Sequence, residues 1–222
     1  MPPLLRACAL LLATSVAGVG AAPPTALELA GAVQRKYDAV KDFSADFVHA
    51  YEGGLLRKQI AERGTLVIKK PGKMRWEYTA PEEKLFVSDG VNMYSYIPQD
   101  KQVIVSAIPP SDQASTPTLF LAGKGNLTRD FTPSFVDPPS GSAADSLALR
   151  LAPKTRQREY DWLTLVVDPA SLTIRGLVTV DAQGGTSRFS FTNLKENVGV
   201  ADKAFVFKMP RGVDVVRASS HD

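Results

Sequence analysis

The spacing of apolar residues changes once in this sequence, near residue 42, and this change constrains the fold more than any other feature. In residues 26–41 apolar side chains recur every three or four positions, which is typical of one buried helix face. After residue 42 they alternate with polar side chains, which is typical of half-buried strands. Turn-forming Pro, Gly and Asp residues separate these segments. The sequence therefore predicts one leading helix followed by a mainly β domain.

The start of the helix and the order of the strands can be predicted in more detail. Thr25 precedes the helix and Glu28 follows three residues later, which is the spacing of a capping box. A second, short helix is expected at 116–122, just before Gly123. The alternating segments that predict strands are 43–48, 64–70, 73–78, 84–88, 91–97, 102–106, 131–136, 147–151, 162–168, 172–180, 186–194, 204–208 and 213–216. A sheet of about ten antiparallel strands with one leading helix favours a single curved sheet or an unclosed barrel.

The first 21 residues have the features of a secretory signal peptide. Arg6 precedes an apolar run at 7–17, and small residues then lead to Ala21, after which we expect cleavage. The alternative is a membrane anchor, but the run is shorter than the about 20 apolar residues that cross a bilayer. The sequence thus predicts a signal peptide at residues 1–21 and one exported domain at residues 22–222.

Composition and motifs argue against several classes of function. Cys8 is the only cysteine and lies in the predicted signal peptide, so we expect no disulfide or cysteine nucleophile in the mature chain. Without Arg6 the chain has 25 basic and 23 acidic residues, a net charge of +2, whereas nucleic-acid binders usually have a strong basic excess. The two histidines, His49 and His221, lie in no catalytic or zinc-binding motif. We therefore expect that the protein is not an enzyme and binds no cofactor, metal or nucleic acid. We also expect a monomer.

Two local patterns have more than one interpretation. Met74, Trp76 and Tyr78 share one face of a predicted strand, and this pattern fits an ordinary core as well as the wall of a cavity. The basic cluster at 69–73 fits a solvated turn, and a docking patch is the less favoured alternative.

Several segments of the sequence resemble the LolA family of outer-membrane lipoprotein carrier proteins. Each segment is weakly informative alone, but together they follow the family's order over essentially the whole mature chain. They are Lys36-Tyr37, FSADF at 43–47, KPGKMRWEY at 70–78, Pro81 with VSDG at 87–90, Tyr96-x-Pro98, LFLAG at 119–123, and the pattern of Phe205, Phe207, Pro210 and Gly212-Val213.

This resemblance implies a curved, incomplete β-barrel with short lid helices over an apolar cavity. It also implies a periplasmic carrier that takes lipoproteins from an inner-membrane ABC transporter and passes them to an outer-membrane acceptor. Family members often have an arginine before the proline of the KPGK segment, where it hydrogen-bonds the lid. Here that residue is Lys70, which keeps the charge but lacks the planar fork of five donors.

The candidate site consists mainly of apolar residues of the predicted strands. The lipid-binding candidates are Phe47, Leu66, Ile68, Met74, Trp76, Tyr78, Phe86, Met93, Tyr94 and Tyr96, and the lid candidates are Lys70, Leu119 and Phe120. Because side chains alternate along a strand, Met93 faces opposite to Tyr94 and Tyr96, so a one-sided cavity excludes some of these three. A cavity would shield acyl chains whose exposure costs about 0.8 kcal/mol per CH₂, or about 12 kcal/mol for a chain of about 16 carbons.

Two other functions remain open from the sequence. One is a periplasmic domain of the same fold that senses lipid or lipoprotein and signals through a partner. The other is an enzyme acting on a lipid-like or small aromatic substrate, although no catalytic group is visible in the sequence.

Overall fold

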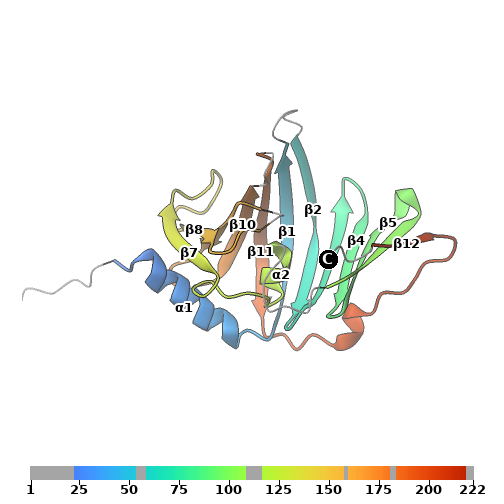
Figure 1. Ribbon diagram of the computed structural model, residues 1–222, viewed down its shortest axis with the longest axis horizontal. Helices are drawn as coiled ribbons and strands as arrows, with labels where there is room; N and C mark the ends of the chain where they lie inside the picture. The colour runs from blue at the N-terminus through green and yellow to red at the C-terminus, as the bar shows by residue number, and fades with distance from the viewer. Residues whose placement is uncertain (1–22, 54–58, 109–116, 158–159, 181–183, 219–222) are drawn as a thin grey trace, which may run out of the picture.

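The computed structural model describes residues 23–53, 59–108, 117–157, 160–180 and 184–218. In this part of the chain, twelve strands form one sheet whose two edges are β12 (Asp214–Arg217) and β7 (Phe131–Val136). The sheet curves but its edges do not pair with each other, so it is not closed into a barrel (Figure 1). The predicted signal peptide at residues 1–21 lies outside the described residues.

The strand order confirms the predicted single sheet. It also shows one strand pairing that the sequence does not indicate. From edge to edge the strands are β12 (Asp214–Arg217), β6 (Gln102–Ala107), β5 (Asn92–Ile97), β4 (Lys84–Asp89), β3 (Lys73–Ala80), β2 (Gln59–Lys69), β1 (Asp42–Glu52), β11 (Thr186–Glu196), β10 (Ile174–Val180), β9 (Trp162–Val167), β8 (Leu147–Pro153) and β7 (Phe131–Val136). The pairing of β1 with β11 joins the two halves of the chain. Neighbours are antiparallel except β12, which pairs with β6 in parallel, so the expectation of a purely antiparallel sheet is wrong at this edge.

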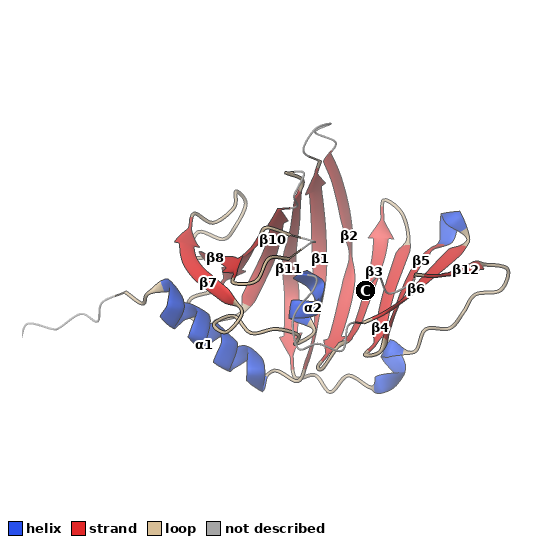
Figure 2. Ribbon diagram, in the orientation of Figure 1, coloured by secondary structure: helices blue, strands red, loops and turns tan. Residues whose placement is uncertain are grey.

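The first helix, α1 (Ala26–Ala39), begins with the predicted capping box. The backbone N–H of Glu28 donates to Oγ1 of Thr25 at 3.2 Å, and the backbone N–H of Thr25 donates to Oε2 of Glu28 at 2.7 Å. Val33 and Tyr37, on the predicted apolar face of the helix, are buried against the sheet. Leu27 belongs to the same predicted face but is exposed. It runs along the half of the sheet that contains β7 to β11 (Figure 2).

The second helix, α2 (Pro117–Leu121), lies close to the predicted position and in front of the sheet (Figure 1). Phe120 and Leu121 are each 1% exposed and belong to the main core together with residues of α1 and of the inner sheet face. Gly123 has φ of +84°, a left-handed conformation that glycine adopts at no steric cost after a helix. We call the sheet face that packs on α1 and α2 the inner face, and the opposite one the outer face.

The predicted strand at 204–208 is wrong. Residues Asp202–Phe205 form a 3-10 helix, η2, which packs on β3 and β4, and no strand follows it until β12 in the described residues. The alternation of Phe205 and Phe207 arises because both rings pack on the outer face, with Phe207 stacked on Tyr94 at 5.0 Å. A second 3-10 helix, η1 (Pro98–Asp100), joins β5 to β6.

Candidate functional site

The inner face of β1 to β4 brings most of the candidate lipid-binding residues together. In the sheet register, Leu66 lies opposite Trp76, and Trp76 lies opposite Phe86. Residues opposite one another point to the same face, so period two along each strand places the candidates of these strands on the inner face. They are Phe47, Leu66, Ile68, Met74, Trp76, Tyr78 and Phe86.

Three aromatic rings meet above a glycine at the centre of this face. The ring of Phe47 lies 5.1 Å from Trp76 and 4.8 Å from Tyr78, measured between centroids, and both contacts are edge-on. A Cβ atom at Gly64 would lie 2.8 Å from the Phe47 ring and 1.9 Å from the carbonyl oxygen of Glu77. The missing side chain of Gly64 therefore makes room for the Phe47 ring.

Phe189 and Phe191 of β11 complete this group, which we call the aromatic cluster: Phe47, Trp76, Tyr78, Phe189 and Phe191. The centroid of Trp76 lies 5.3 Å from that of Phe189 and 6.4 Å from that of Phe191. Sequence reasoning missed both phenylalanines. Their alternation within the predicted strand 186–194 is a signal for one face, but only the pairing of β1 with β11 brings them to Phe47.

The aromatic cluster is packed, and the space left beside it is small. Phe47 and Trp76 are 2% and 3% exposed, respectively. An apolar cavity of about 10 Å³ lies between α1, α2 and β11, lined by Tyr37, Phe43, Leu121, Leu172, Ile174, Phe191 and Leu194, with Lys36 and Glu196 also at its wall. This volume is about what one water molecule needs, whereas ligand pockets usually have about 300–1,000 Å³. The space between α1, α2 and β11 is therefore filled in this structure, whereas the expectation from the sequence is an open apolar cavity, and we call this arrangement the closed state.

Two backbone carbonyl groups hold α2 over the inner face. The hydroxyl of Tyr37 donates to the carbonyl oxygen of Leu121, and the backbone N–H of Gly72 donates to that of Ala122 at 2.8 Å. The Tyr37 ring also stacks on Phe120, with centroids 5.9 Å apart. The position of Phe120 thus fits its predicted place in the lid, while the side chain of Leu119 lies outside the described part of the structure.

Lys70 lies beside the lid but contacts it through Tyr37. Its Nζ donates to the backbone carbonyl of Tyr37 and lies 4.2 Å from the centroid of the Tyr37 ring. Its side chain also packs on Gly123, where a Cβ atom would lie 2.6 Å from Cδ of Lys70. Burial lowers the pKa of Lys70, and the charge of Asp38 partly opposes this shift.

Strand β5 divides the three remaining candidates between the two faces. Met93 lies opposite Ser88 and packs against the inner core. Tyr94 lies opposite Val87 on the outer face, and the rings of Tyr94 and Tyr96 lie 5.0 and 6.3 Å from Phe207. The structure therefore keeps Met93 among the candidates for the inner face and corrects the assignment of Tyr94 and Tyr96.

A polar group lies next to the aromatic cluster, at the end of the inner face away from Phe43. Nδ1 of His49 lies 3.0 Å from Oε2 of Glu62, and its Nε2 lies 2.7 Å from Oγ of Ser187. Lys84 donates to Oε1 of Glu62 at 2.5 Å. The His49 ring stacks on Phe189 at 4.2 Å. Burial lowers the pKa of His49 and outweighs the hydrogen bond and charge of Glu62, which raise it.

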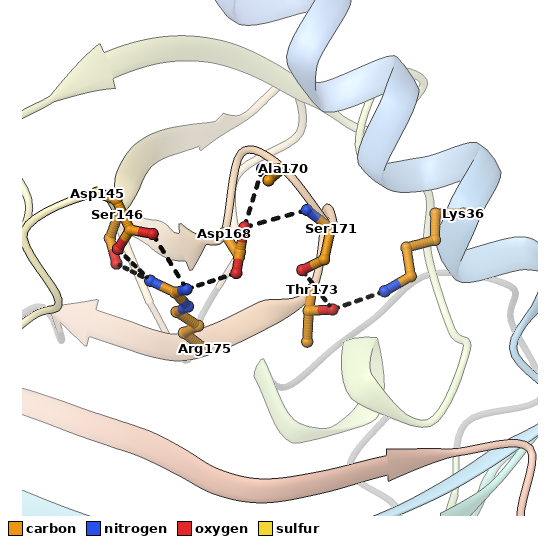
Figure 3. A network of polar contacts seen from close by, with 8 residues as sticks. All are labelled: Lys36, Asp145, Ser146, Asp168, Ala170, Ser171, Thr173 and Arg175. Atoms are coloured by element: carbon orange, nitrogen blue, oxygen red, sulfur yellow. Dashed lines mark hydrogen bonds and ion pairs between the residues drawn. The ribbon is translucent and has the colours of Figure 1, made fainter.

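A second polar network fixes α1 beside the small cavity (Figure 3). In the turn between β9 and β10, the Asp168 carboxylate accepts the backbone N–H of Ala170 at 2.9 Å and also binds Arg175. Thr173 of the same turn accepts a hydrogen bond at 2.7 Å from Lys36 of α1. Leu172, between these anchors, therefore has a fixed position in the cavity wall.

The described residues also place limits on other kinds of site. They contain no group of three or more His, Cys, Asp or Glu side chains that could hold a metal ion. None of their helices is long and apolar enough to cross a membrane.

Comparison with known proteins gives a consistent result. The family described as outer membrane lipoprotein carrier protein LolA matches residues 38–208. An outer-membrane lipoprotein carrier protein of Chromohalobacter salexigens is 31% identical over 210 residues, which cover 92% of this chain and 96% of that protein. One of Bordetella pertussis is 30% identical over 217 residues, which cover 96% of this chain and 97% of that protein.

A solved structure shares the fold at low sequence identity. An uncharacterized conserved protein from Thermus thermophilus has a TM-score of 0.51 at 13% identity, covering 85% of this chain and 97% of that one. The family match extends over most of the sequence, and the two relatives align with nearly all of it. The chain therefore belongs to the LolA family of outer membrane lipoprotein carrier proteins.

Proposed function

We propose that this protein is a periplasmic carrier that binds the acyl chains of lipoproteins on the inner face of its sheet. In this proposal residues 1–21 direct export, and residues 22–222 form the carrier domain. The observation that carries it is an apolar aromatic cluster beneath a short helix held by few hydrogen bonds, in a sheet that is not closed. The names of the two relatives support lipoproteins as the cargo.

The free energy of acyl burial is large enough for this role. A chain of about 16 carbons gains about 12 kcal/mol when it leaves water, at about 0.8 kcal/mol per CH₂. Most of the inner face consists of uncharged side chains, and Phe43 and Tyr78 are among them. Because apolar contacts are non-directional, the same surface accepts acyl chains of different lengths.

Opening the closed state costs less than acyl burial gains, although it also exposes Phe120 and Leu121, whose burial contributes about 1.5–3 kcal/mol each. The lid helix α2 has five residues, and the bonds from Tyr37 and Gly72 each contribute about 0.5–1.5 kcal/mol. When α2 moves aside, acyl chains replace it as the cover of the inner face. A ligand that binds the open state better than the closed one shifts the population toward the open state.

Directed transfer requires partners in addition to this surface. Binding alone sets populations and gives no direction. We propose an inner-membrane ABC transporter as the energised donor and an outer-membrane acceptor with higher affinity as the destination. The carrier itself then needs no catalytic group and no cofactor.

Extraction of lipoproteins from membranes tests the proposal. The mature protein is mixed with inner-membrane vesicles that contain the lipoprotein-releasing transporter and a triacylated lipoprotein, with and without ATP. We expect a soluble complex of the two proteins only with ATP. No soluble complex under either condition would contradict a carrier, and a complex that never releases its cargo to outer-membrane vesicles would favour the lipid-sensing alternative.

A further inference from the structure

The indole nitrogen of Trp76 is a buried donor at the centre of the inner face. Trp76 is 3% exposed, and no described residue accepts a hydrogen bond from its Nε1. Buried polar groups are paired in the great majority of cases, and an unpaired one destabilises the state that contains it. Among the described residues, the Nε1 of Trp76 and the Nε of Arg150 are the two buried side-chain donors without a partner, and Trp76 is the one on the inner face.

The described ring contacts of Trp76 are with phenylalanine side chains, which supply only weak acceptors. The nearest rings are those of Phe47 at 5.1 Å and Phe189 at 5.3 Å, both edge-on to the indole. An aromatic face accepts an N–H group much more weakly than a carbonyl oxygen does. A phenylalanine or leucine at position 76 would give an apolar surface without an unpaired donor. The indole N–H is thus a buried polar group in a mainly apolar part of the proposed binding surface.

We propose that Trp76 donates a hydrogen bond to the carbonyl oxygen of a bound acyl group, in ester or amide linkage. This inference rests on the proposed function and names the chemical group that the inner face recognises. An acyl chain offers one strong acceptor, at the carbon where the chain begins, and the inner face offers the buried, unpaired donor of Trp76. A plain hydrocarbon chain of equal length leaves that donor unpaired and binds less tightly.

The position of Trp76 along β3 also sets the direction in which a bound acyl chain lies on the inner face. Met74 lies on one side of it and Tyr78 on the other, two residues away along the same face. The apolar side chains of Met74 and Ile68 lie toward the lid end. On the other side, His49 stacks on Phe189, and Glu62 bonds to His49. When the carbonyl of the acyl group is bound at Trp76, the acyl tail extends toward the lid. The polar head then extends toward His49 and Glu62.

Indole NMR tests this contact directly, because the chain has two tryptophans. In a Trp162→Phe variant the indole N–H resonance belongs to Trp76 alone. Three lipids of equal chain length serve as probes: a diacylglycerol with ester carbonyls, an N-acyl amino acid with an amide carbonyl, and an ether-linked dialkylglycerol with neither. Displacement of a fluorescent fatty acid confirms that each lipid binds.

We expect the indole proton of Trp76 to shift downfield with the ester and amide lipids and not with the ether lipid. A response to the amide points to the amino-terminal acyl group of a lipoprotein, whereas a response to the ester alone points to a diacylglyceryl group, which phospholipids share. Binding of all three lipids with the same resonance would overturn the carbonyl contact and leave the proposed function intact. Failure of all three lipids to bind would overturn both.

A variant pair separates the hydrogen bond from loss of packing. Trp76→Phe removes the donor, and Phe189→Leu removes a similar amount of ring from the same cluster. For the unaltered protein we expect the ester lipid to bind about tenfold tighter than the ether lipid, the effect of one hydrogen bond. In Trp76→Phe this ratio falls to about one, while Phe189→Leu weakens both lipids and keeps the ratio. An unchanged ratio in Trp76→Phe would contradict the proposal.

Discussion

The hydroxyl of Tyr37 in α1 donates a hydrogen bond to the backbone carbonyl of Leu121, the last residue of α2. The same ring stacks on Phe120 and lies under the ammonium group of Lys70. Burial raises the pKa of Tyr37 well above its usual range, so the hydroxyl keeps its proton and remains a donor. Tyr37 is therefore the residue through which α1 and Lys70 both hold the lid.

Replacing Tyr37 with phenylalanine should loosen α2 while keeping the ring contacts. The variant loses one buried hydrogen bond, so we expect the free energy of unfolding to fall by about 1 kcal/mol. Hydrogen exchange at residues 120–123 should become faster, and a fluorescent fatty acid should enter sooner. Tyr94→Phe is the matched control, because it removes the hydroxyl that bonds Asp89 at 3.2 Å on the outer face. Equal exchange at residues 120–123 in both variants would contradict a lid held by Tyr37.

Lys70 should stabilise the lid through its charge. Lys70→Met keeps most of the side-chain length but loses the hydrogen bond to Tyr37 and the cation–π contact, which together contribute about 1–2 kcal/mol. We expect faster exchange in α2 and a lower urea midpoint. Lys70→Arg retains a donor and a charge, so its lid should be at least as well protected. If hydrogen exchange in α2 is as slow in Lys70→Met as in the unaltered protein, the charge of Lys70 does not contribute to lid closure.

Features decided by nearby residues could be predicted from the sequence. The capping box of Thr25 and Glu28 depends on three residues of spacing, and α2 depends on Pro117 and Gly123 at its ends. The shared face of Met74, Trp76 and Tyr78 follows from period two alone. Neither spacing nor composition shows which strands far apart in the chain pair, so the contact of β1 with β11 and the parallel β12 could not be predicted.

The same limit explains the errors in the candidate site. Whether Met93 or Tyr94 faces inward depends on the register of β5 with β4 and on which face the helices cover. Phe205 and Phe207 alternate like a strand, but their partner is the outer face of the sheet. The role of Tyr37 depends on α2, which lies 80 residues further along the chain and meets it only in the folded state.

Two glycines should respond in opposite ways to the same substitution. Gly64→Ala places a methyl group against the backbone of β3 and the ring of Phe47, so we expect a loss of about 3 kcal/mol or more in the free energy of unfolding. Gly31→Ala lies in α1, where the nearest atom would be Nη1 of Arg35 at 3.4 Å, and should stabilise the protein by up to about 1 kcal/mol. Urea unfolding measures both. If Gly64→Ala left the free energy of unfolding unchanged, β2 and β3 would be able to move apart without cost.

His49 should make the stability of the protein depend on pH. Burial holds its pKa below the ordinary value of about 6.5, so the unfolded chain binds a proton at a higher pH than the folded chain does. The stabilising contribution of neutral His49 is therefore complete above about pH 6.5 and is lost as the pH falls through the pKa of the folded state. One proton gives a slope of at most about 1.4 kcal/mol per pH unit in this window.

Glutamine at position 49 tests this link, because its amide can bond Glu62 and Ser187 but does not titrate. Urea unfolding of His49→Gln between pH 7 and pH 5 should show a smaller loss of stability on acidification than the unaltered protein shows. His221→Gln removes the other histidine of the chain and is the control. Two results would contradict the assignment. Either His221→Gln flattens the pH profile, or His49→Gln keeps the full slope, in which case carboxylates alone cause it.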